Sequence, residues 1–249
     1  MLFKLSQWSF VCGLLLLGAA LFFKDQLPDP NFFDDSVLQE PRQENTEREP
    51  FEVRVGEQNY RIIPQFDYAL DGVVVSFNHA DDWDNIYHRN WQDFINIKDV
   101  CVIWGANLQS GVYQRMSFKN TSWTCWFNWP DRATAAQFSA DQLSNNHLLS
   151  DNPALLRLIR QAETGDQIRF KGVLAKYENP ANGFQRGTSI SRTDTGNGAC
   201  ETVYLDEFEI VRKANSGWRA AFSLSIWVTL ISAVVWTGLV MSGRGSHKN

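Results

Sequence analysis

Apolar residues are concentrated in two long runs, one near each end of the chain. Residues 8–23 and 220–243 contain no charged side chain. The second run exceeds the roughly 20 residues that a helix needs to cross a bilayer, so it is predicted to be a C-terminal transmembrane helix. The first run is shorter and follows Lys4, so residues 1–23 are predicted to be an N-terminal transmembrane helix or signal-anchor. A buried helix is the alternative for each run.

Residues 24–50 are polar and acidic and include four prolines. Such a segment has little apolar surface to bury, so it is predicted to be a solvated acidic linker. Phe32 and Phe33 form its strongest apolar spot. This pair is a candidate anchor or docking point.

Alternating and β-branched segments follow the linker. Residues 51–64 predict a hairpin around the turn-forming residues 56–59, with Pro64 at its end. Three further β-rich segments each predict one strand: residues 71–77, 99–105 and 122–129.

The clearest helix after the terminal runs covers residues 151–162. Asp151 or Asn152 can cap its first turn, and Pro153 suits the first helical position. Apolar residues recur on one side of the helix, and Gly165 can stop it. We therefore expect a short amphipathic helix that packs against the strands.

Residues 165–213 contain two further predicted strands, separated by a polar loop at residues 178–199. Ile168, Phe170 and Leu174 alternate with charged residues, as expected for a strand with one buried face. These two strands and the helix before them complete an order of three strands, one helix and two strands.

This order resembles the OB fold, a five-stranded Greek-key barrel with a helix between its third and fourth strands. The sequence from Gly165 to Gly172 is similar to the entry of its fourth strand, and residues 204–211 are similar to its last strand. The resemblance covers about residues 71–213. It implies a mainly β (α+β) chain with an OB-like five-stranded antiparallel barrel and one capped helix, flanked by two transmembrane helices.

The resemblance also implies where a ligand would bind. OB folds bind on the face of strands two and three and on two loops, which correspond here to residues 78–98 and 178–199. The soluble domain is expected to cover residues 51–213. The whole chain is similar to uncharacterised bacterial proteins that combine a membrane anchor with a single soluble domain.

The charge of the soluble part argues against one class of partner. All 28 acidic residues lie between residues 24 and 221, with all but three of the 23 lysine and arginine residues. An acidic domain repels the phosphate backbone, so nucleic acid is not an expected partner.

The chain has four cysteines. Cys12 lies in the first apolar run. The other three, Cys101, Cys125 and Cys200, allow one disulfide in three possible pairings. They contain no CxxC spacing, so neither a structural zinc site nor a thioredoxin-like site is expected. The alternative is that they are small buried residues on strands.

Residues 79–88 contain two histidines and three aspartates. His79, Asp81, Asp84 and His88 could bind a divalent metal through mixed nitrogen and oxygen ligands. Their spacing matches no known metal motif, and a solvated acidic loop is the favoured alternative. No cofactor is expected.

Aromatic residues suggest a second kind of site. Trp83 and Trp91 lie in a polar loop and are candidates for a binding surface, because tryptophan is enriched at binding hot spots. Trp104 and one face of residues 122–129 are expected to fill the core.

The loop at residues 187–201 offers a third candidate. Its hydroxyl residues, with Arg192 and Asp194, could hold a ligand by hydrogen bonds, and a flexible connecting loop is the alternative. The chain has no GxSxG motif, and His147 is expected in a turn or cap rather than as a catalytic base.

These features together predict a membrane-anchored, non-enzymatic binding or scaffold module at the cell envelope that engages a protein partner. A metal-assisted hydrolase and a structural subunit of a membrane complex are the alternatives. We expect a two-span protein of the bacterial inner membrane, with both termini on one side and the soluble domain extracytoplasmic.

Overall fold

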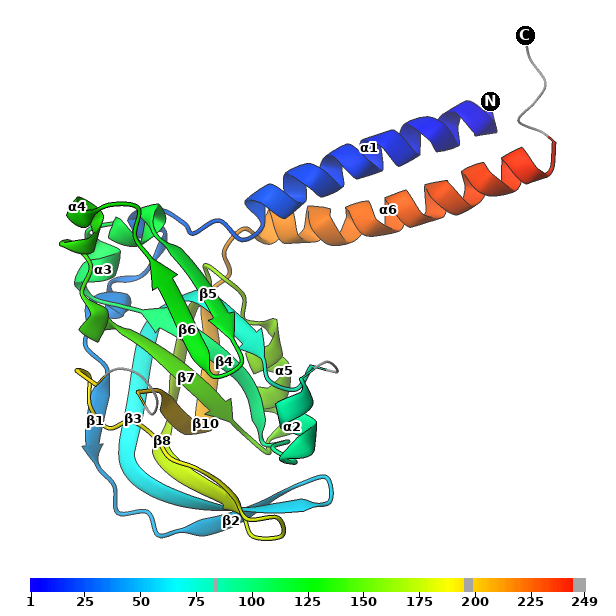
Figure 1. Cartoon of the computed structure of the whole chain (residues 1–249). Helices are drawn as coiled ribbons and strands as arrows, with labels where there is room; N and C mark the ends of the chain where they lie inside the picture. The colour runs from blue at the N-terminus through cyan, green and yellow to red at the C-terminus, as the bar shows by residue number, and fades with distance from the viewer. Residues whose placement is uncertain (83–84, 195–198, 244–249) are drawn as a thin grey trace. The chain divides into compact units, whose positions relative to one another are not determined.

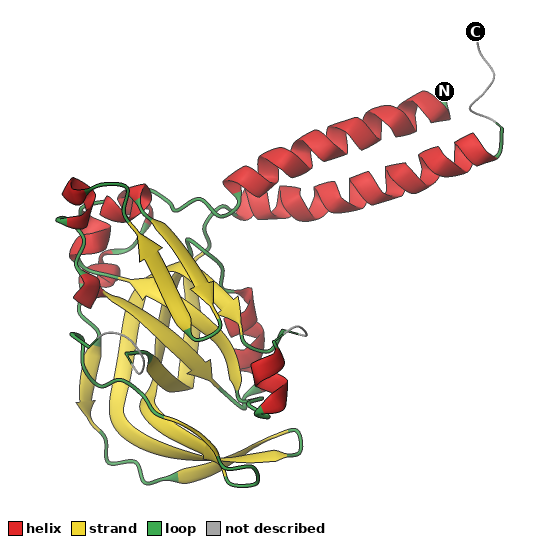
Figure 2. Cartoon of the chain, viewed as in Figure 1, coloured by secondary structure: helices red, strands yellow, loops and turns green. Residues whose placement is uncertain are grey.

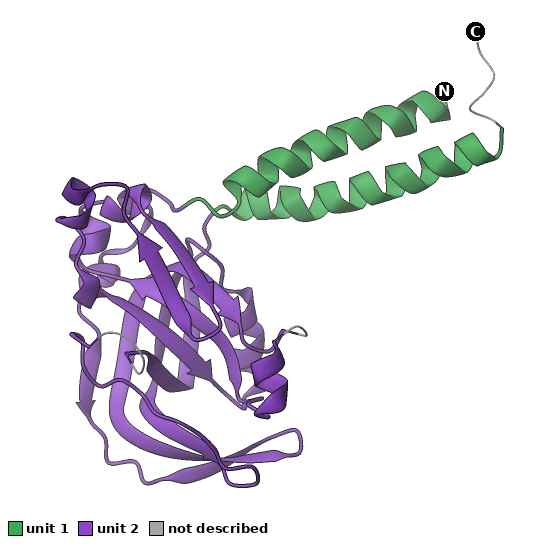
Figure 3. Cartoon of the chain, viewed as in Figure 1, with its two compact units in different colours: residues 1–26, 215–249 green, residues 27–214 purple. Residues whose placement is uncertain are grey.

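The computed structural model divides the chain into two compact units (Figure 3), and its structure is described here for residues 1–82, 85–194 and 199–243. Unit 1 combines residues 1–26 with residues 215–249, and unit 2 is formed by residues 27–214. Trp83 and Asp84, both named above as candidate site residues, lie outside the described residues.

Unit 1 is a pair of antiparallel helices, α1 (Leu2–Phe23) and α6 (Ser216–Met241) (Figure 2). Small residues face the partner helix: a Cβ at Gly13 would lie 2.6 Å from Thr229 Oγ1. Both helices are long and apolar enough to cross a membrane. Large side chains such as Leu15 and Trp227 are exposed on them, which suits contact with lipid.

Unit 2 is β-rich and is coloured from blue to orange in Figure 1. Its strands are β1 (Arg42–Asn45), β2 (Phe51–Val55), β3 (Gln58–His79), β4 (Asn96–Ile103), β5 (Ser117–Thr121), β6 (Thr124–Asn128), β7 (Leu143–Leu149), β8 (Gln167–Asn179), β9 (Phe184–Arg186) and β10 (Glu201–Arg212). Its α-helices are α2 (Ile86–Asn90), α3 (Ala106–Gln109), α4 (Arg132–Ala135) and α5 (Pro153–Gln161), with 3-10 turns at Pro30–Phe32, Asp35–Leu38, Val112–Arg115 and Ala140–Gln142.

The strand pairings of the large sheet return to their starting strand. β3 pairs with β4, β4 with β7, β7 with β10, β10 with β8, and β8 with β3 again. β3 pairs with both β8 and β4 because it is long: its residues from Arg61 to Val73 pair with β8, and those from Val73 to His79 pair with β4. Register shifts after Pro64 and after Val74 bend this strand, so that it can pair with β8 along one part and with β4 along the other.

The interior of this sheet is filled by apolar residues from all five strands, among them Leu70, Val100, Leu148, Phe170 and Val203. Helix α5 adds Leu155 and Ile159 to the same core.

Each end of α5 is held by a side chain. Asn152 accepts a hydrogen bond from the amide of Ala154 at 2.9 Å, which confirms the predicted capped helix. At the other end, the buried Lys98 donates to the carbonyl of Ala162. The helix is therefore fixed to β4 at its C-terminus.

The third predicted strand forms, but it does not belong to the large sheet. Residues 122–129 contribute to β6, which pairs with β5 in a separate hairpin, and β7 takes the place between β4 and β10. The polar residues from Ser144 to His147 look like a turn in the sequence, but in the structure they lie on a strand and are buried. Their burial is possible because other buried polar groups form hydrogen bonds with them. β7 and β10 are parallel, unlike the other pairs of the large sheet, because the chain reverses direction twice between them.

Two other expectations need correction. Pro64 does not end the hairpin of β2 and β3: it lies at a register shift within a continuous β3. The expected solvated linker instead contributes two 3-10 turns and strand β1, and its Phe33 and Val37 are buried in an apolar cluster within unit 2. Over the described chain, helix and strand contents are about equal, so the chain is mixed α+β rather than mainly β.

Candidate binding site

Four aromatic side chains, Tyr87, Trp91, Trp123 and Phe184, form a cluster on unit 2, here called the aromatic cluster. Trp91 lies at its centre, with ring centroids 5.1 Å from Tyr87, 5.4 Å from Trp123 and 5.6 Å from Phe184. Tyr87 and Trp91 are 41% and 40% exposed. The cluster therefore presents ring surface to solvent although its members contact one another.

The cluster joins three segments that are distant in the sequence. Tyr87 and Trp91 come from α2 and its C-cap, Trp123 from the turn between β5 and β6, and Phe184 from β9. Asn182 Nδ2 donates to the carbonyl of Trp91 at 2.8 Å. The loops after β3 and after β8, which correspond to the two loops expected from the sequence, therefore contact each other.

Two residues at the aromatic cluster have a strained backbone conformation. Trp123 has a φ of 79°, and Gln92, next to Trp91, has a φ of 52°. Residues with a Cβ seldom adopt this left-handed region, and surrounding contacts have to hold them there. At the start of α2, Asn85 accepts a hydrogen bond from the amide of His88 at 3.2 Å and so fixes the helix that carries Tyr87.

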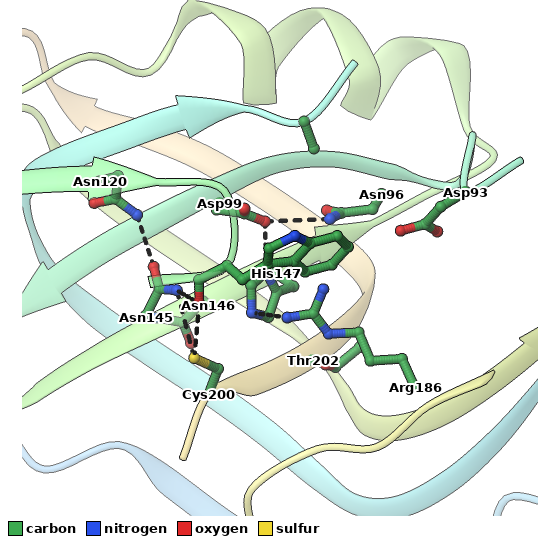
Figure 4. A network of polar contacts seen from close by, with 12 residues as sticks. Asp93, Asn96, Asp99, Asn120, Asn145, Asn146, His147, Arg186, Cys200 and Thr202 are labelled. Carbon is green, nitrogen blue, oxygen red and sulfur yellow. Dashed lines mark hydrogen bonds and ion pairs between the residues drawn. The ribbon is translucent and has the colours of Figure 1, made fainter. Parts of the chain in front are cut away.

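A buried polar network lies next to the cluster (Figure 4). His147 Nδ1 is 2.5 Å from Asp99 Oδ1, and Arg186 Nη2 contacts His147 Nε2. Since an arginine can only donate, Nε2 accepts and Nδ1 carries the proton that is donated to Asp99. The guanidinium of Arg186 also lies 4.0 Å from the centroid of the Trp123 ring. The network thus connects β4, β7 and β9 to the hairpin.

The buried surroundings determine which groups of this network are ionised. Burial, with Arg186 nearby, lowers the pKa of His147, so its imidazole is neutral. Burial opposes ionisation of Asp99, but His147, Arg186 and Asn96 outweigh it and lower the pKa of Asp99. The network therefore holds one carboxylate, one neutral imidazole and one guanidinium.

The chemistry open to His147 is limited. An Asp–His pair resembles the base of a hydrolase triad, in which Nε2 takes a proton from a nucleophile. Here Nε2 is occupied by Arg186, and His147 is fully buried. Cys200, whose Sγ lies 3.3 Å from the carbonyl oxygen of Trp123, has a pKa raised by burial and is a protonated thiol. The arrangement holds the site together rather than moving a proton.

A narrow recess, too small to hold a water molecule, lies beside the network. Its lining residues come from the loop after β3, from α2, β4 and the hairpin turn: Ala80, Asn85, His88, Asp93, Asn96, Asp99, Ser122 and Trp123. Asp93 is 1% exposed, and its Oδ1 accepts a hydrogen bond from the Tyr177 hydroxyl at 2.8 Å. Burial raises the pKa of Asp93 to about 7.

The disulfide Cys101–Cys125 joins β4 to β6 and so ties the hairpin to the sheet. The sequence allowed this pairing among three. Cys200 and Cys12 are free thiols. The turn that carries Trp123 is therefore attached covalently two residues away, at Cys125.

The expected metal ligands have other partners. Asp81 bonds to Arg160 at 2.9 Å, His79 packs on Phe77 at 5.2 Å, and His88 packs on Phe94. Within the described ranges, no group of three or more His, Cys, Asp or Glu side chains could hold a metal. Because Asp84 lies outside those ranges, the four-residue metal site stays a prediction.

The side chains of Arg192 and Asp194 interact with residues in or next to their own loop. Arg192 Nη1 is 2.6 Å from Glu201 Oε1, and Asp194 accepts a hydrogen bond from Ser189 at 2.6 Å. Neither residue contributes to the aromatic cluster or the recess, and their role in ligand binding stays a prediction. Among the candidates that lie in the described ranges, Trp91 is the one that the structure places in the cluster.

Sequence reasoning missed Asp93, Asp99, His147, Arg186 and the site role of Trp123. Asp99 gave a signal, since it is a carboxylate at the start of an apolar strand. Asp93 and Arg186 lie in the two loops expected to bind a ligand, but their individual roles could not be predicted because their contacts join residues that are far apart in the sequence. No protein-family model, curated protein or solved structure matches the chain. Function is therefore inferred from the chain's own geometry.

Proposed function

We propose that this protein is a membrane-anchored, non-enzymatic binding module of the bacterial cell envelope, and that its aromatic cluster engages a protein partner. The observation that carries this proposal is the cluster itself. Tyr87 and Trp91 keep about two fifths of their surface exposed, beside Ile86 at 55%. Exposed contiguous apolar surface of this kind is typical of interaction sites.

The identity of the residues favours a protein partner. Tyrosine and tryptophan are enriched at protein–protein hot spots, because a rigid ring offers large contact area at low cost in conformational entropy. Trp123 is held in position by Arg186, and Trp91 by Asn182. A surface that is already ordered loses less entropy on binding, which favours affinity.

The non-enzymatic part of the proposal rests on His147. A general base needs a free nitrogen within reach of a substrate proton. His147 has both ring nitrogens engaged and no exposed surface. The same contacts suit a structural role beneath a binding surface.

We further propose that unit 2 is an OB-type barrel. The strand pairings that lead from β3 through β4, β7, β10 and β8 back to β3 support this, as does α5 between the third and fourth strands of that series. The cluster combines residues from the loops that follow the first and fourth of these strands, where OB folds bind their ligands. Strands β1, β2 and β9 and the β5–β6 hairpin are additions to that plan.

The proposed location is the inner membrane, with α1 and α6 as its two spans and unit 2 outside the cytoplasm. The disulfide Cys101–Cys125 supports this placement, because disulfides persist in the periplasm and are rare in the cytosol. Two spans put both termini on the same side of the membrane.

Capture of the partner from native membranes tests the proposed function. Full-length chain carrying Trp91→Ala should retain at least about tenfold less of a specific protein than the unchanged chain, as expected for loss of a hot spot. Trp126→Ala is the matched control, since Trp126 is 56% exposed but lies outside the cluster. Equal capture by both variants would contradict the proposal.

A further inference from the structure

The side chain of Arg192 reaches two rings of the apolar core of the large sheet. Its Cζ lies 5.1 Å from the centroid of the Tyr68 ring and 5.6 Å from that of the Trp104 ring. Both rings belong to the core and are 3% and 0% exposed. Nη1 of the same guanidinium lies 2.6 Å from Oε1 of Glu201, which is also 3% exposed. Tyr68, Trp104 and Glu201 therefore surround one position, and they are called the guanidinium cage.

The chemistry of the guanidinium cage suits the group that occupies it. An aromatic face attracts a cation within about 6 Å of its centroid, and Arg192 meets this condition at both rings. A guanidinium is planar, so it stacks on rings and can also form two parallel hydrogen bonds to one carboxylate. An ammonium is compact and offers neither contact. The cage therefore favours arginine over lysine.

Arg192 uses the cage incompletely. Nη1 donates to Oε1 of Glu201, whereas the buried Nη2 has no hydrogen-bond partner among the described residues. Oε2 of Glu201 and the hydroxyl of Tyr68 are likewise buried without a partner there. A guanidinium aligned as a fork on the carboxylate would satisfy both carboxylate oxygens. The cage can thus hold a better aligned guanidinium more tightly than it holds Arg192.

The loop that carries Arg192 is fixed at its base and exposed at its tip. At the base, Thr202 donates from its amide to Oγ1 of Thr188 at 2.9 Å. At the tip, Ile190 is 52% exposed, and Gln43 donates to its carbonyl at 3.0 Å. The side chain of Arg192 is 24% exposed. The tip can therefore leave the core while the strands and the base of the loop keep their pairings.

The departure of Arg192 requires a replacement. Glu201 would otherwise keep a buried charge without a counter-ion, which is costly. Burial raises the pKa of Glu201 to about 7, and Asp194 adds to the rise while Arg192 opposes it. Burial also raises the pKa of Tyr68, so that ring stays neutral. An incoming cation restores the pair, and a neutral group does not.

We propose that the guanidinium cage is a binding site for an arginine of the protein partner, and that Arg192 occupies the cage until that arginine takes its place. The inference rests on the proposed function, because the incoming arginine belongs to the protein partner. Arg192 is then a built-in competitor with a high effective concentration, since it is part of the same chain. It excludes partners that lack an arginine at the matching position.

The test uses the full-length chain in detergent micelles and the probe Nα-acetyl-arginine N-methylamide. The indole N–H signal of Trp104 in the NMR spectrum reports binding, and the indole of Trp126 is the internal control. In Arg192→Ala, the Trp104 signal should shift with a millimolar dissociation constant. In the unchanged chain, the same shift should need at least about tenfold more probe, because Arg192 competes. No shift in either chain, or a shift in Arg192→Ala alone, would overturn the proposal.

Two control probes test the chemistry of the cage. The citrulline analogue has nearly the same shape but no charge, and it should leave the Trp104 signal unshifted. The lysine analogue should bind at least about tenfold more weakly than the arginine probe. Equal binding of the three probes would overturn the assignment.

Two further variants guard against misfolding. Adding Glu201→Gln to Arg192→Ala should weaken binding of the arginine probe at least about tenfold, and undiminished binding would overturn the cage. Unchanged indole signals of Trp91 and Trp126 show that a variant is folded. If Arg192→Ala does not fold, Arg192→Lys keeps a cation in the cage and should still bind the probe more tightly than the unchanged chain does. Equal or weaker binding by Arg192→Lys would overturn the proposal.

Capture from native membranes tests the exchange with a protein. Arg192→Ala should retain at least about threefold more partner than the unchanged chain, because the competitor is gone. Arg61→Ala is the matched control, since Arg61 pairs with Glu178 at 3.4 Å but has a side chain that is 51% exposed. Equal or lower capture by Arg192→Ala would contradict a competing role for Arg192.

Failure of this inference differs from failure of the proposed function. If the arginine probe does not bind while Trp91→Ala still abolishes capture of a protein, the guanidinium cage alone is overturned as a binding site. If the probe binds as expected but no protein is captured, the protein partner is overturned, and the guanidinium has another source.

Discussion

The guanidinium of Arg186 lies 4.0 Å from the centroid of the Trp123 ring, and the same guanidinium bonds to the buried His147. A partly exposed ring of the aromatic cluster is therefore coupled directly to the network that joins β4, β7 and β9. Because the ring cannot move without disturbing the half-buried Arg186 and its bond to His147, the position of Trp123 is fixed before any partner arrives.

Glycine should be tolerated better than alanine at position 123. Both substitutions remove the ring, but only glycine relieves the φ of 79°. We expect Trp123→Gly to be more stable than Trp123→Ala by about 1 kcal/mol. Denaturant unfolding of the full-length chain, followed by circular dichroism, measures the difference. At Trp126, within strand β6, the order should reverse, and the same order at both positions would contradict a strained turn.

The pH dependence of stability should report Asp93. The pKa of this group is raised from 3.8 to about 7, so the folded state binds the extra proton between these values. Stability from this group is therefore present below about pH 4 and is lost as the pH rises to about 7, by on the order of a few kcal/mol. Asp93→Asn should flatten that part of the profile when unfolding is measured from pH 4 to pH 7.

A control is needed because burial also raises the pKa of Glu201 to about 7. Glu201→Gln should remove a separate share of the slope, and the double variant should remove both shares. An unchanged slope in Asp93→Asn would show that Asp93 is not a buried carboxyl without a cationic partner.

Gly172 should be essential for the pairing of β8 with β10 on one side and with β3 on the other. A Cβ at this position would lie 2.0 Å from the carbonyl oxygen of Tyr204, which is backbone and cannot move aside. We expect Gly172→Ala to destabilise the protein by roughly 3 kcal/mol or more, or to prevent folding. Gly187→Ala is the matched control, because nothing lies within 4 Å of the position that its Cβ would occupy. Similar stability of both variants would contradict the close approach of β8 and β10.

The disulfide should stabilise unit 2 and report its compartment. It closes a loop with a sequence separation of 24, so Cys125→Ser should cost about 3 kcal/mol, whereas Cys200→Ser should cost much less. In intact cells, thiol labelling followed by mass spectrometry should find Cys101 and Cys125 blocked. If both are labelled as free thiols, the extracytoplasmic placement is wrong.

Local signals in the sequence were enough to predict several elements. The cap at Asn152 and the apolar stripe located α5, and the turn around Gly56 located the β2–β3 hairpin. Alternation located β8 and β10. Each of these signals depends on neighbouring residues, which is why the sequence alone reveals them.

The missed features depend on distant contacts. β7 is hidden because Asn145 and His147 are polar, and they become good strand residues only when Asn120 and Asp99 face them. The recess was missed for the same reason, since Asp93 and Tyr177 are far apart in the sequence. Trp91 was found because a tryptophan in a polar loop is unusual. That signal can be seen in the sequence without knowing which residues surround it.

Photo-crosslinking from Ile86 is the most direct measurement of binding at the aromatic cluster. Ile86 is 55% exposed beside Tyr87, and Ile190, at 52%, is a matched position outside the cluster. A photoreactive residue at each position in turn, in the full-length chain in native membranes, should give one specific protein adduct from position 86 and none from position 190. The same adducts from both positions, or none from position 86, would contradict a protein-binding role for the cluster.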